Sequence, residues 1–136
     1  MKIMVIDGQG GRLGLAIIEG LRAAKVPAEI IAVGTNSAAT GTMMNGKADA
    51  GATGENAVVV NARDADYIIG PIGIVVADSL HGEISPQMAV AVGQSKARKI
   101  LLPMSRCNTC VVGVQEMPFA ELIKLAVNQI LSASCV

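Results

Sequence analysis

Short apolar runs alternate along the chain with glycine-containing turns and with longer segments whose apolar residues recur at helical spacing. Runs that are apolar on both faces are typical of parallel strands, and the longer segments are typical of amphipathic helices. The pattern predicts strands at residues 3–6, 29–33, 48–52, 66–69, 99–104 and 110–114, and helices at 12–25, 37–45, 55–63, 74–80, 85–97 and from 118 onward. This alternation predicts an α/β fold with a mostly parallel sheet.

Two of these segments carry signals beyond their apolar spacing. We expect the 3–6 strand near the centre of the sheet, because it is apolar on both faces and leads into a glycine turn. The 55–63 segment is ambiguous, because Val58, Val59 and Val60 favour a strand. Thr53 and Glu55, however, are typical of a helix start. A helix also continues the alternation, so we expect one there.

The strongest local motif joins the first predicted strand to the first predicted helix. We call the segment Gly8-Gln9-Gly10-Gly11-Arg12-Leu13-Gly14 the glycine loop. In this context glycines allow a sharp turn, a close approach of the backbone to a pyrophosphate, and tight packing of the helix on the sheet. Backbone N–H groups at the helix start would face the ligand, and Arg12 could add a charge-assisted bond. We therefore predict phosphate binding at Gly8, Gln9, Gly10, Gly11, Arg12 and Leu13, with a merely tight turn as the alternative.

Two further segments follow predicted strands. The second strand ends at Thr35 and Asn36, where dinucleotide-binding folds carry an acidic residue that holds the ribose. These two side chains could still hydrogen-bond a ribose or a 2′-phosphate. Gly70, Pro71 and Gly73 follow another strand, and the carboxyl ends of strands in open α/β sheets line the ligand crevice. A plain strand-exit turn is the alternative.

Histidine and cysteine offer weaker candidates for chemistry. His81 lies three residues after Asp78 and could act as a general base, although a surface histidine is the simpler interpretation. Cys107 and Cys110 form a single CxxC pair, and Cys135 is remote in sequence. Because zinc sites usually need a second pair of ligands, we expect no structural metal. Arg106 could lower the pKa of the Cys107 thiol, which leaves a reactive cysteine open.

Composition narrows the classes of function. The 136 residues carry 11 basic and 11 acidic side chains, and only 1% are aromatic. A neutral chain without a basic surface or a base-stacking platform is not expected to bind nucleic acid. No apolar run is long enough to cross a membrane, and the first residues do not resemble a signal peptide. An odd number of cysteines argues against a secreted disulfide framework, so we expect one cytoplasmic domain, residues 1–136.

Nearly the whole chain resembles a family of small bacterial proteins described only as a domain of unknown function. The segments that carry the resemblance are residues 5–11, 34–36, 51–56, 69–73 and 106–108. It implies a Rossmann-like fold, a three-layer sandwich, and supplies no activity. The glycine loop is also similar to the cofactor loop of dihydrodipicolinate reductase, which implies nicotinamide-dinucleotide contacts at residues 8–13. The histidine pair, the lysine and the substrate domain of that reductase have no counterpart in this chain.

These observations favour a small protein that binds NAD(P) or another nucleotide through the glycine loop, with no reaction assigned. A non-catalytic ligand sensor or assembly module is the second hypothesis, and a thiol enzyme using Cys107 is the third. We expect a homo-oligomer, because residues 72–77 carry no charge and a one-domain nucleotide binder leaves its ligand half open.

Overall fold

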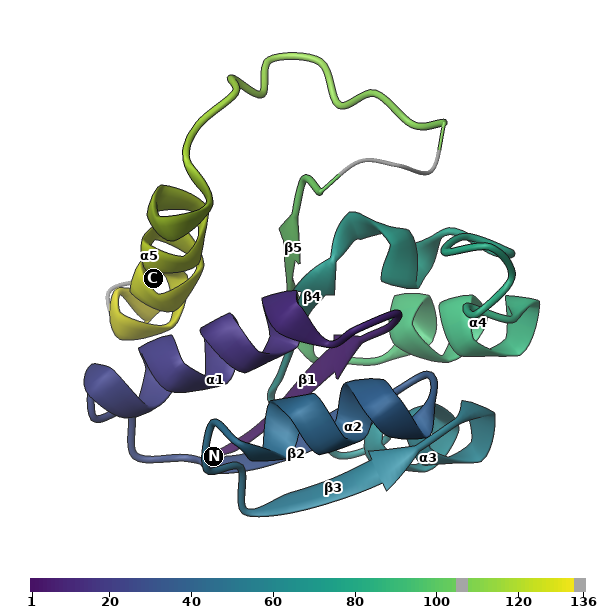
Figure 1. The fold of residues 1–136 in the computed structure, drawn as a ribbon, viewed down its shortest axis with the longest axis horizontal. Helices are drawn as coiled ribbons and strands as arrows, with labels where there is room; N and C mark the ends of the chain where they lie inside the picture. The colour runs from purple at the N-terminus through teal and green to yellow at the C-terminus, as the bar shows by residue number, and fades with distance from the viewer. Residues whose placement is uncertain (105–107, 134–136) are drawn as a thin grey trace.

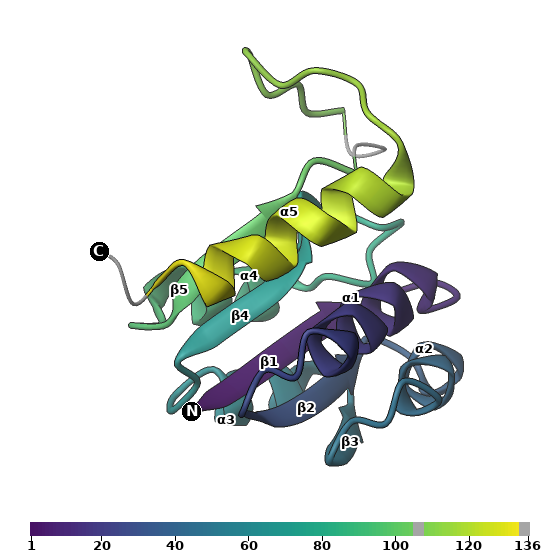
Figure 2. The same ribbon diagram turned by 90° about the vertical axis from the view of Figure 1, so that its left-hand side faces the viewer.

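The structure is a computed structural model and describes residues 1–104 and 108–133. Its five strands form one parallel sheet in the order β3-β2-β1-β4-β5 (Figures 1 and 2). The strands are β1 (Lys2–Asp7), β2 (Glu29–Gly34), β3 (Ala50–Thr53), β4 (Tyr67–Pro71) and β5 (Arg98–Leu102). The expected parallel α/β fold with the first strand at its centre is therefore confirmed.

Helices cover both faces of the sheet, which gives three layers (Figure 2). The helices are α1 (Arg12–Ala23), α2 (Ser37–Met44), α3 (Glu55–Asn61), α4 (Pro86–Gln94) and α5 (Phe119–Leu131), with a 3₁₀ turn η1 (Ile72–Val75). One apolar cluster joins the sheet to α1, α2 and α5, and the other joins it to α3 and α4. Alternate residues of β1 point into the two clusters: Ile3 and Val5 into the first, Met4 and Ile6 into the second. This explains why the strand is apolar on both faces.

Local capping fixes where several helices begin. The Asn36 side chain accepts a hydrogen bond from the Ala39 N–H at 2.8 Å and so caps α2. Ser85 caps α4 in the same way, with Pro86 at the first helical position. The ambiguous 55–63 segment is a helix, α3, and it carries Glu55 in its first turn. Val58 is buried on that helix against the sheet.

Two predicted elements are wrong. Residues 74–80 do not form an α-helix, because only the 3₁₀ turn η1 forms and turns with left-handed residues follow it. Residues 110–114 do not form a strand. Their valines have strand propensity, but β5 ends at Leu102, Pro103 follows, and the chain then leads away from the sheet edge. A β-prone run without a neighbouring strand has no partner for its backbone groups.

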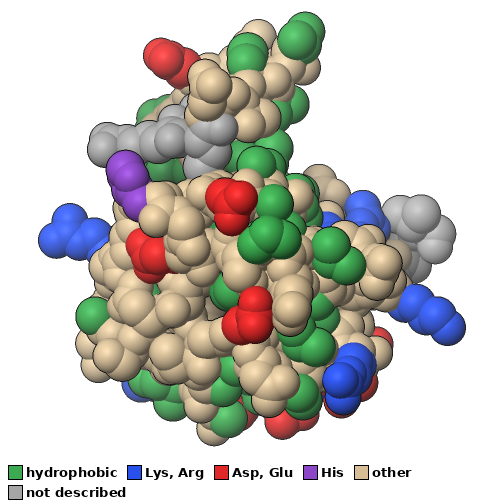
Figure 3. Space-filling model, turned by 90° about the vertical axis from the view of Figure 1, so that its right-hand side faces the viewer, with side chains coloured by type: hydrophobic (Ala, Val, Ile, Leu, Met, Phe, Trp, Pro, Cys, Tyr) green, Lys and Arg blue, Asp and Glu red, His purple; other side chains and the backbone are tan. Residues whose placement is uncertain are grey.

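Residues 108–118, which we call the arm, lead into α5 without a helix or strand of their own. The arm projects beyond the carboxyl end of the sheet before the chain returns along α1 as α5 (Figure 1). Val112 is 94% exposed, and hydrophobic side chains are visible along this projection at the top of the space-filling view (Figure 3). No helix in the described part of the chain is long and apolar enough to cross a membrane.

Candidate functional site

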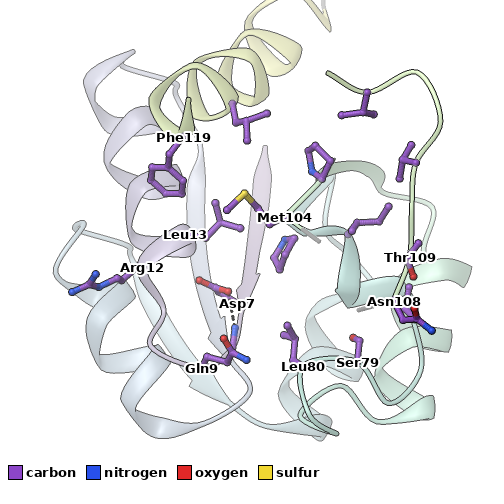
Figure 4. Close-up of a pocket in the computed structure, with 18 of the residues that line it drawn as sticks. Asp7, Gln9, Arg12, Leu13, Ser79, Leu80, Met104, Asn108, Thr109 and Phe119 are labelled. Atoms are coloured by element: carbon purple, nitrogen blue, oxygen red, sulfur yellow. Dashed lines mark hydrogen bonds between the residues drawn. The ribbon is translucent and has the colours of Figure 1, made fainter. Parts of the chain in front are cut away.

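An open cleft of about 1360 Å³ lies beyond the carboxyl ends of β1 and β4. The chain leaves β1 through α1 toward β2, whereas it leaves β4 through α4 toward β5 on the other side. The boundary between β1 and β4 is therefore the point where the winding of the sheet reverses, which is where open α/β sheets bind ligands. The walls come from the glycine loop, from residues after β4 and β5, from the arm and from the start of α5 (Figure 4).

Some glycines of the loop allow close packing of the backbone, and one leaves the loop open to solvent. Gly11 has φ +74°, and a Cβ there would lie 2.5 Å from the backbone oxygen of Ala39. A Cβ at Gly14 would meet Met43 at 2.3 Å and Asp7 at 3.0 Å, so this glycine lets α1 pack closely on the sheet and on α2. A Cβ at Gly10 would meet nothing within 4 Å. Gly10 is therefore the glycine of this group that opens toward solvent.

Asp7 ends β1 at the floor of the cleft and is only 6% exposed. Its two carboxylate oxygens accept the N–H groups of Gly8 and Gly14, at 2.8 Å and 2.7 Å. Burial raises the pKa of Asp7, and the charge of Glu83 acts in the same direction, although the Gly14 and Gly8 N–H groups oppose them. Asp7 is thus a buried carboxyl group at the floor of the cleft that is hydrogen-bonded to the backbone of the glycine loop.

Glu83 binds the glycine loop to the end of β2. Its Oε1 accepts hydrogen bonds from the Gln9 N–H at 2.9 Å, the Thr35 hydroxyl at 2.6 Å and the Asn36 side-chain amide at 2.7 Å. Burial opposes ionisation, but these hydrogen bonds outweigh it and hold the pKa of Glu83 below its ordinary value. The carboxylate therefore closes the side of the glycine loop that faces β2.

Left-handed backbone conformations gather around the cleft. In the described chain seven non-glycine residues have positive φ, and five of these line the cleft: Gln9, Asp78, Leu80, His81 and Asn108. Each such conformation costs on the order of 1–3 kcal/mol and persists only where the surroundings hold it. Strain of this kind concentrates at ligand sites and switch regions, so its clustering supports this cleft as the functional site.

The upper part of the cleft is apolar. Leu13, Met104 and Phe119 lie toward one another there, and the Arg12 side chain points away from the cavity (Figure 4). No lysine lines the cleft in the part of the chain that the structure describes. Acidic side chains are visible on the adjacent face, with Lys and Arg at its margins (Figure 3). A ligand would therefore meet backbone N–H groups and apolar walls, with His81 among the polar side chains of the lining.

The structure brings together some of the sequence-predicted site residues but not all of them. The cleft is lined by Gly8, Gln9, Gly10, Gly11, Arg12, Leu13 and Pro71. Thr35 and Asn36 lie beside the loop but bind Glu83, and Asn36 also caps α2. Gly70 and Gly73 do not line the cleft: a Cβ at Gly70 would lie 2.4 Å from the Ile6 oxygen, and the Gly73 carbonyl accepts the Ser79 hydroxyl.

His81 and Cys110 both line the cleft, whereas Cys107 and Cys135 lie outside the described residues. Within residues 1–104 and 108–133, no group of three or more His, Cys, Asp and Glu side chains is arranged to hold a metal ion. The expectation about structural metal therefore stays a prediction, since two of the cysteines are not described.

Sequence reasoning missed three residues of the site. Asp7 could have been found, because it is the last residue of a buried strand and the ends of parallel strands line the crevice. Glu83 gave no comparable signal, since it reaches the glycine loop from 74 residues away in sequence. Phe119 is the first residue of α5, and only the return of the chain through the arm places it opposite Leu13.

Comparison with known proteins places the chain within a family. No curated protein sequence matches it. Among solved structures, a dodecameric FMN-dependent UbiX-like decarboxylase from Escherichia coli O157:H7 is similar, with 16% sequence identity and a TM-score of 0.47. The similarity covers 100% of this chain and 96% of that one. A family model covers residues 2–134, so the chain belongs to the family described as Domain of unknown function (DUF3842).

Proposed function

We propose that the cleft binds a nucleotide-type ligand, with a phosphate group at the start of α1 and a ring system against the apolar wall. The observation that carries this proposal is the position of the α1 N-terminus, which opens onto the cleft where the winding of the sheet reverses. In the described chain the backbone N–H groups of Gly10 and Arg12 make no hydrogen bond within the protein. These two donors are therefore available to a phosphate oxygen.

The shape and chemistry of the upper cleft support the second half of the proposal. Leu13, Met104 and Phe119 offer an apolar surface beside the glycine loop, and such surfaces with a few polar groups are typical of small-molecule sites (Figure 4). NAD(P) stays among the ligands to test, because the glycine loop is similar to the cofactor loop of dihydrodipicolinate reductase. No reaction is assigned, and a sensor that binds without catalysis fits the same geometry.

A thermal-shift panel tests the proposal. It contains NAD(H), NADP(H), ATP, S-adenosylmethionine, AMP and FMN, of which the last two carry one phosphate on a ring system. A ligand present at a hundred times its Kd adds about 2.7 kcal/mol of apparent stability, which the assay resolves. We expect at least one nucleotide to raise the melting temperature of the wild-type protein. A panel without any shift at millimolar concentration would count against the proposal.

The variant Gly10→Val locates the binding. A Cβ at Gly10 meets no atom within 4 Å, so the variant should fold while its side chain covers the free N–H groups. We expect about a tenfold loss of nucleotide affinity or more, measured by calorimetry with circular dichroism as a check on folding. Gly93→Val, in open space on α4, is the matched control and should bind as the wild type does. Gly11→Val is unsuitable, because its clash with Ala39 would disturb the fold itself.

A further inference from the structure

Three hydrogen-bond donors from two different loops converge on one atom, the Oε1 of Glu83. Gln9 donates from the glycine loop, and Thr35 and Asn36 donate from the end of β2, all at 2.6–2.9 Å. In folds of this type, the turns after the first two strands are the ones that contact a bound dinucleotide. Here the donors are arranged as an anion site, and a carboxylate of the protein itself fills it.

The segment that carries Glu83 is held at its two ends and left-handed between them. We call residues 78–83 the strap. Ser79 is buried and donates its hydroxyl to the Gly73 carbonyl, and Ile84 is buried beyond the other end. Between these anchors Leu80, His81 and Gly82 all have positive φ, and His81 and Gly82 are exposed. The backbone hydrogen bonds donated by Gly82 and Glu83 end on residues 78–80, so the tip can move as one turn without breaking a backbone bond to the sheet.

The charges around the site make Glu83 and an external anion mutually exclusive. Asp7 already lies close enough for the two carboxylates to repel each other. No lysine lines the cleft in the described chain, and the Arg12 side chain points away from it (Figure 4). A phosphate added beside both carboxylates would place a third negative group in the site, against the attraction of His81, whose charge already acts on Glu83. An anion can bind these donors only if Glu83 leaves.

We propose that Glu83 is a built-in competitor: its carboxylate fills an anion site formed by Gln9, Thr35 and Asn36, and the phosphomonoester of a ligand displaces it and moves the strap. The inference rests on the proposed function, because the same glycine loop serves both. It adds a second phosphate position, on the β2 side of the loop, and a conformational response to its occupation. A binding event at the glycine loop would thereby change the exposed surface at residues 80–82.

The affinity of inorganic phosphate for variants of Glu83 tests this inference. Glu83→Ala frees the three donors, so we expect it to bind inorganic phosphate at least roughly tenfold more tightly than the wild type does, by calorimetry. Glu83→Gln keeps the shape of the side chain without the charge, and we expect a smaller gain in the same direction. The matched control is Glu19→Gln, which removes one negative charge from an exposed position of α1 outside the cleft. It should bind phosphate as the wild type does.

A second measurement follows the strap directly. When inorganic phosphate is added to the wild type at saturating concentration, NMR amide shifts of residues 78–83 should change, while those of β3 should not. The inference would be overturned if both Glu83→Ala and Glu83→Gln bind phosphate no more tightly than the wild type does. It would also be overturned if neither variant binds phosphate at all. If nucleotide binding depends on Gly10 but the Glu83 variants gain no phosphate affinity, Glu83 is not a competitor, and the proposed function stays intact. Tighter phosphate binding by these variants, without any nucleotide binding by the wild type, would refute the proposed function and leave the role of Glu83 as a competitor intact.

Discussion

A single oxygen of Glu83 accepts hydrogen bonds from two other loops, so its protonation is coupled to the stability of the cleft wall. The pKa of Glu83 in the folded protein lies below the ordinary value of 4.5. Its contribution to stability is therefore fully present above that value and is lost as pH falls through the folded pKa. Burial raises the pKa of Asp7, which gives the opposite trend, because ionised Asp7 is disfavoured in the fold.

These signs predict a pH-dependent difference between the wild type and Glu83→Gln. The wild type should have the higher free energy of unfolding at neutral pH, and the difference should shrink as pH falls below the ordinary carboxyl range. Urea denaturation at several pH values between neutral and acidic measures both proteins. Asp7 is present in both, so the part of its opposite trend that comes from burial cancels in the difference, whereas its repulsion from Glu83 is lost in the variant. A difference that grows on acidification would contradict the assigned hydrogen bonds.

Among single residues, sequence reasoning found those whose role depends on local chain context. The glycine loop was recognisable because its strand, its glycines and its helix are contiguous. The partners of that loop were not, because Glu83 approaches through a turn whose left-handed residues have no sequence signature here. The missing acidic residue at the end of β2 is a related case. A carboxylate does reach Thr35 and Asn36, but it comes from the segment after β4.

At the scale of elements, hydrophobic periodicity was sufficient wherever packing follows the local pattern. It predicted the central position of β1, the parallel strands and the amphipathic helix α5. It failed at residues 110–114, where strand propensity is strong but the fold supplies no neighbouring strand. It also failed at residues 74–80, where the chain must turn back across the end of β4 to reach Ser85.

Substitutions on the buried and the exposed face of α5 should differ in their effect on the free energy of unfolding. Ile130 is 7% exposed and packs in the cluster with α1, whereas Leu125 is 47% exposed. Ile130→Ala should lower the free energy of unfolding by about 2–4 kcal/mol, because it leaves a cavity. Leu125→Ala should cost less than about 1 kcal/mol in the same urea titration. Similar losses for both variants would mean that Leu125 is covered by a surface outside this chain.

At the scale of the whole molecule, exposed apolar side chains gather on the arm and on α5. They are Val111, Val112, Val114, Met117, Phe119, Leu125 and Leu131. Contiguous exposed apolar surface on a small protein is typical of an interaction site. These residues form the rim of the open cleft or continue from it along α5, so an associating copy would also shield a bound ligand.

We therefore expect a homo-oligomer, most simply a dimer, in solution. Sedimentation equilibrium at micromolar concentration should give a mass above that of the 13.9 kDa chain. Val112→Asp should shift the distribution toward the monomer, because a charge would replace a fully accessible apolar group. A single species at the chain mass, with or without nucleotide, would show that a neighbouring copy does not complete the cleft.

The two outer strands of the sheet limit how such an assembly can form. An open strand edge can template continuous intermolecular pairing, the first step toward fibrils, unless it is short, charged or interrupted by proline. β3 is four residues long and contains Gly51, and β5 starts with Arg98 and Lys99 and is followed by Pro103. Both edges therefore resist extension by a second sheet. Copies of this chain are expected to join through helix and arm surfaces, so an assembly can close on itself instead of growing into a fibre.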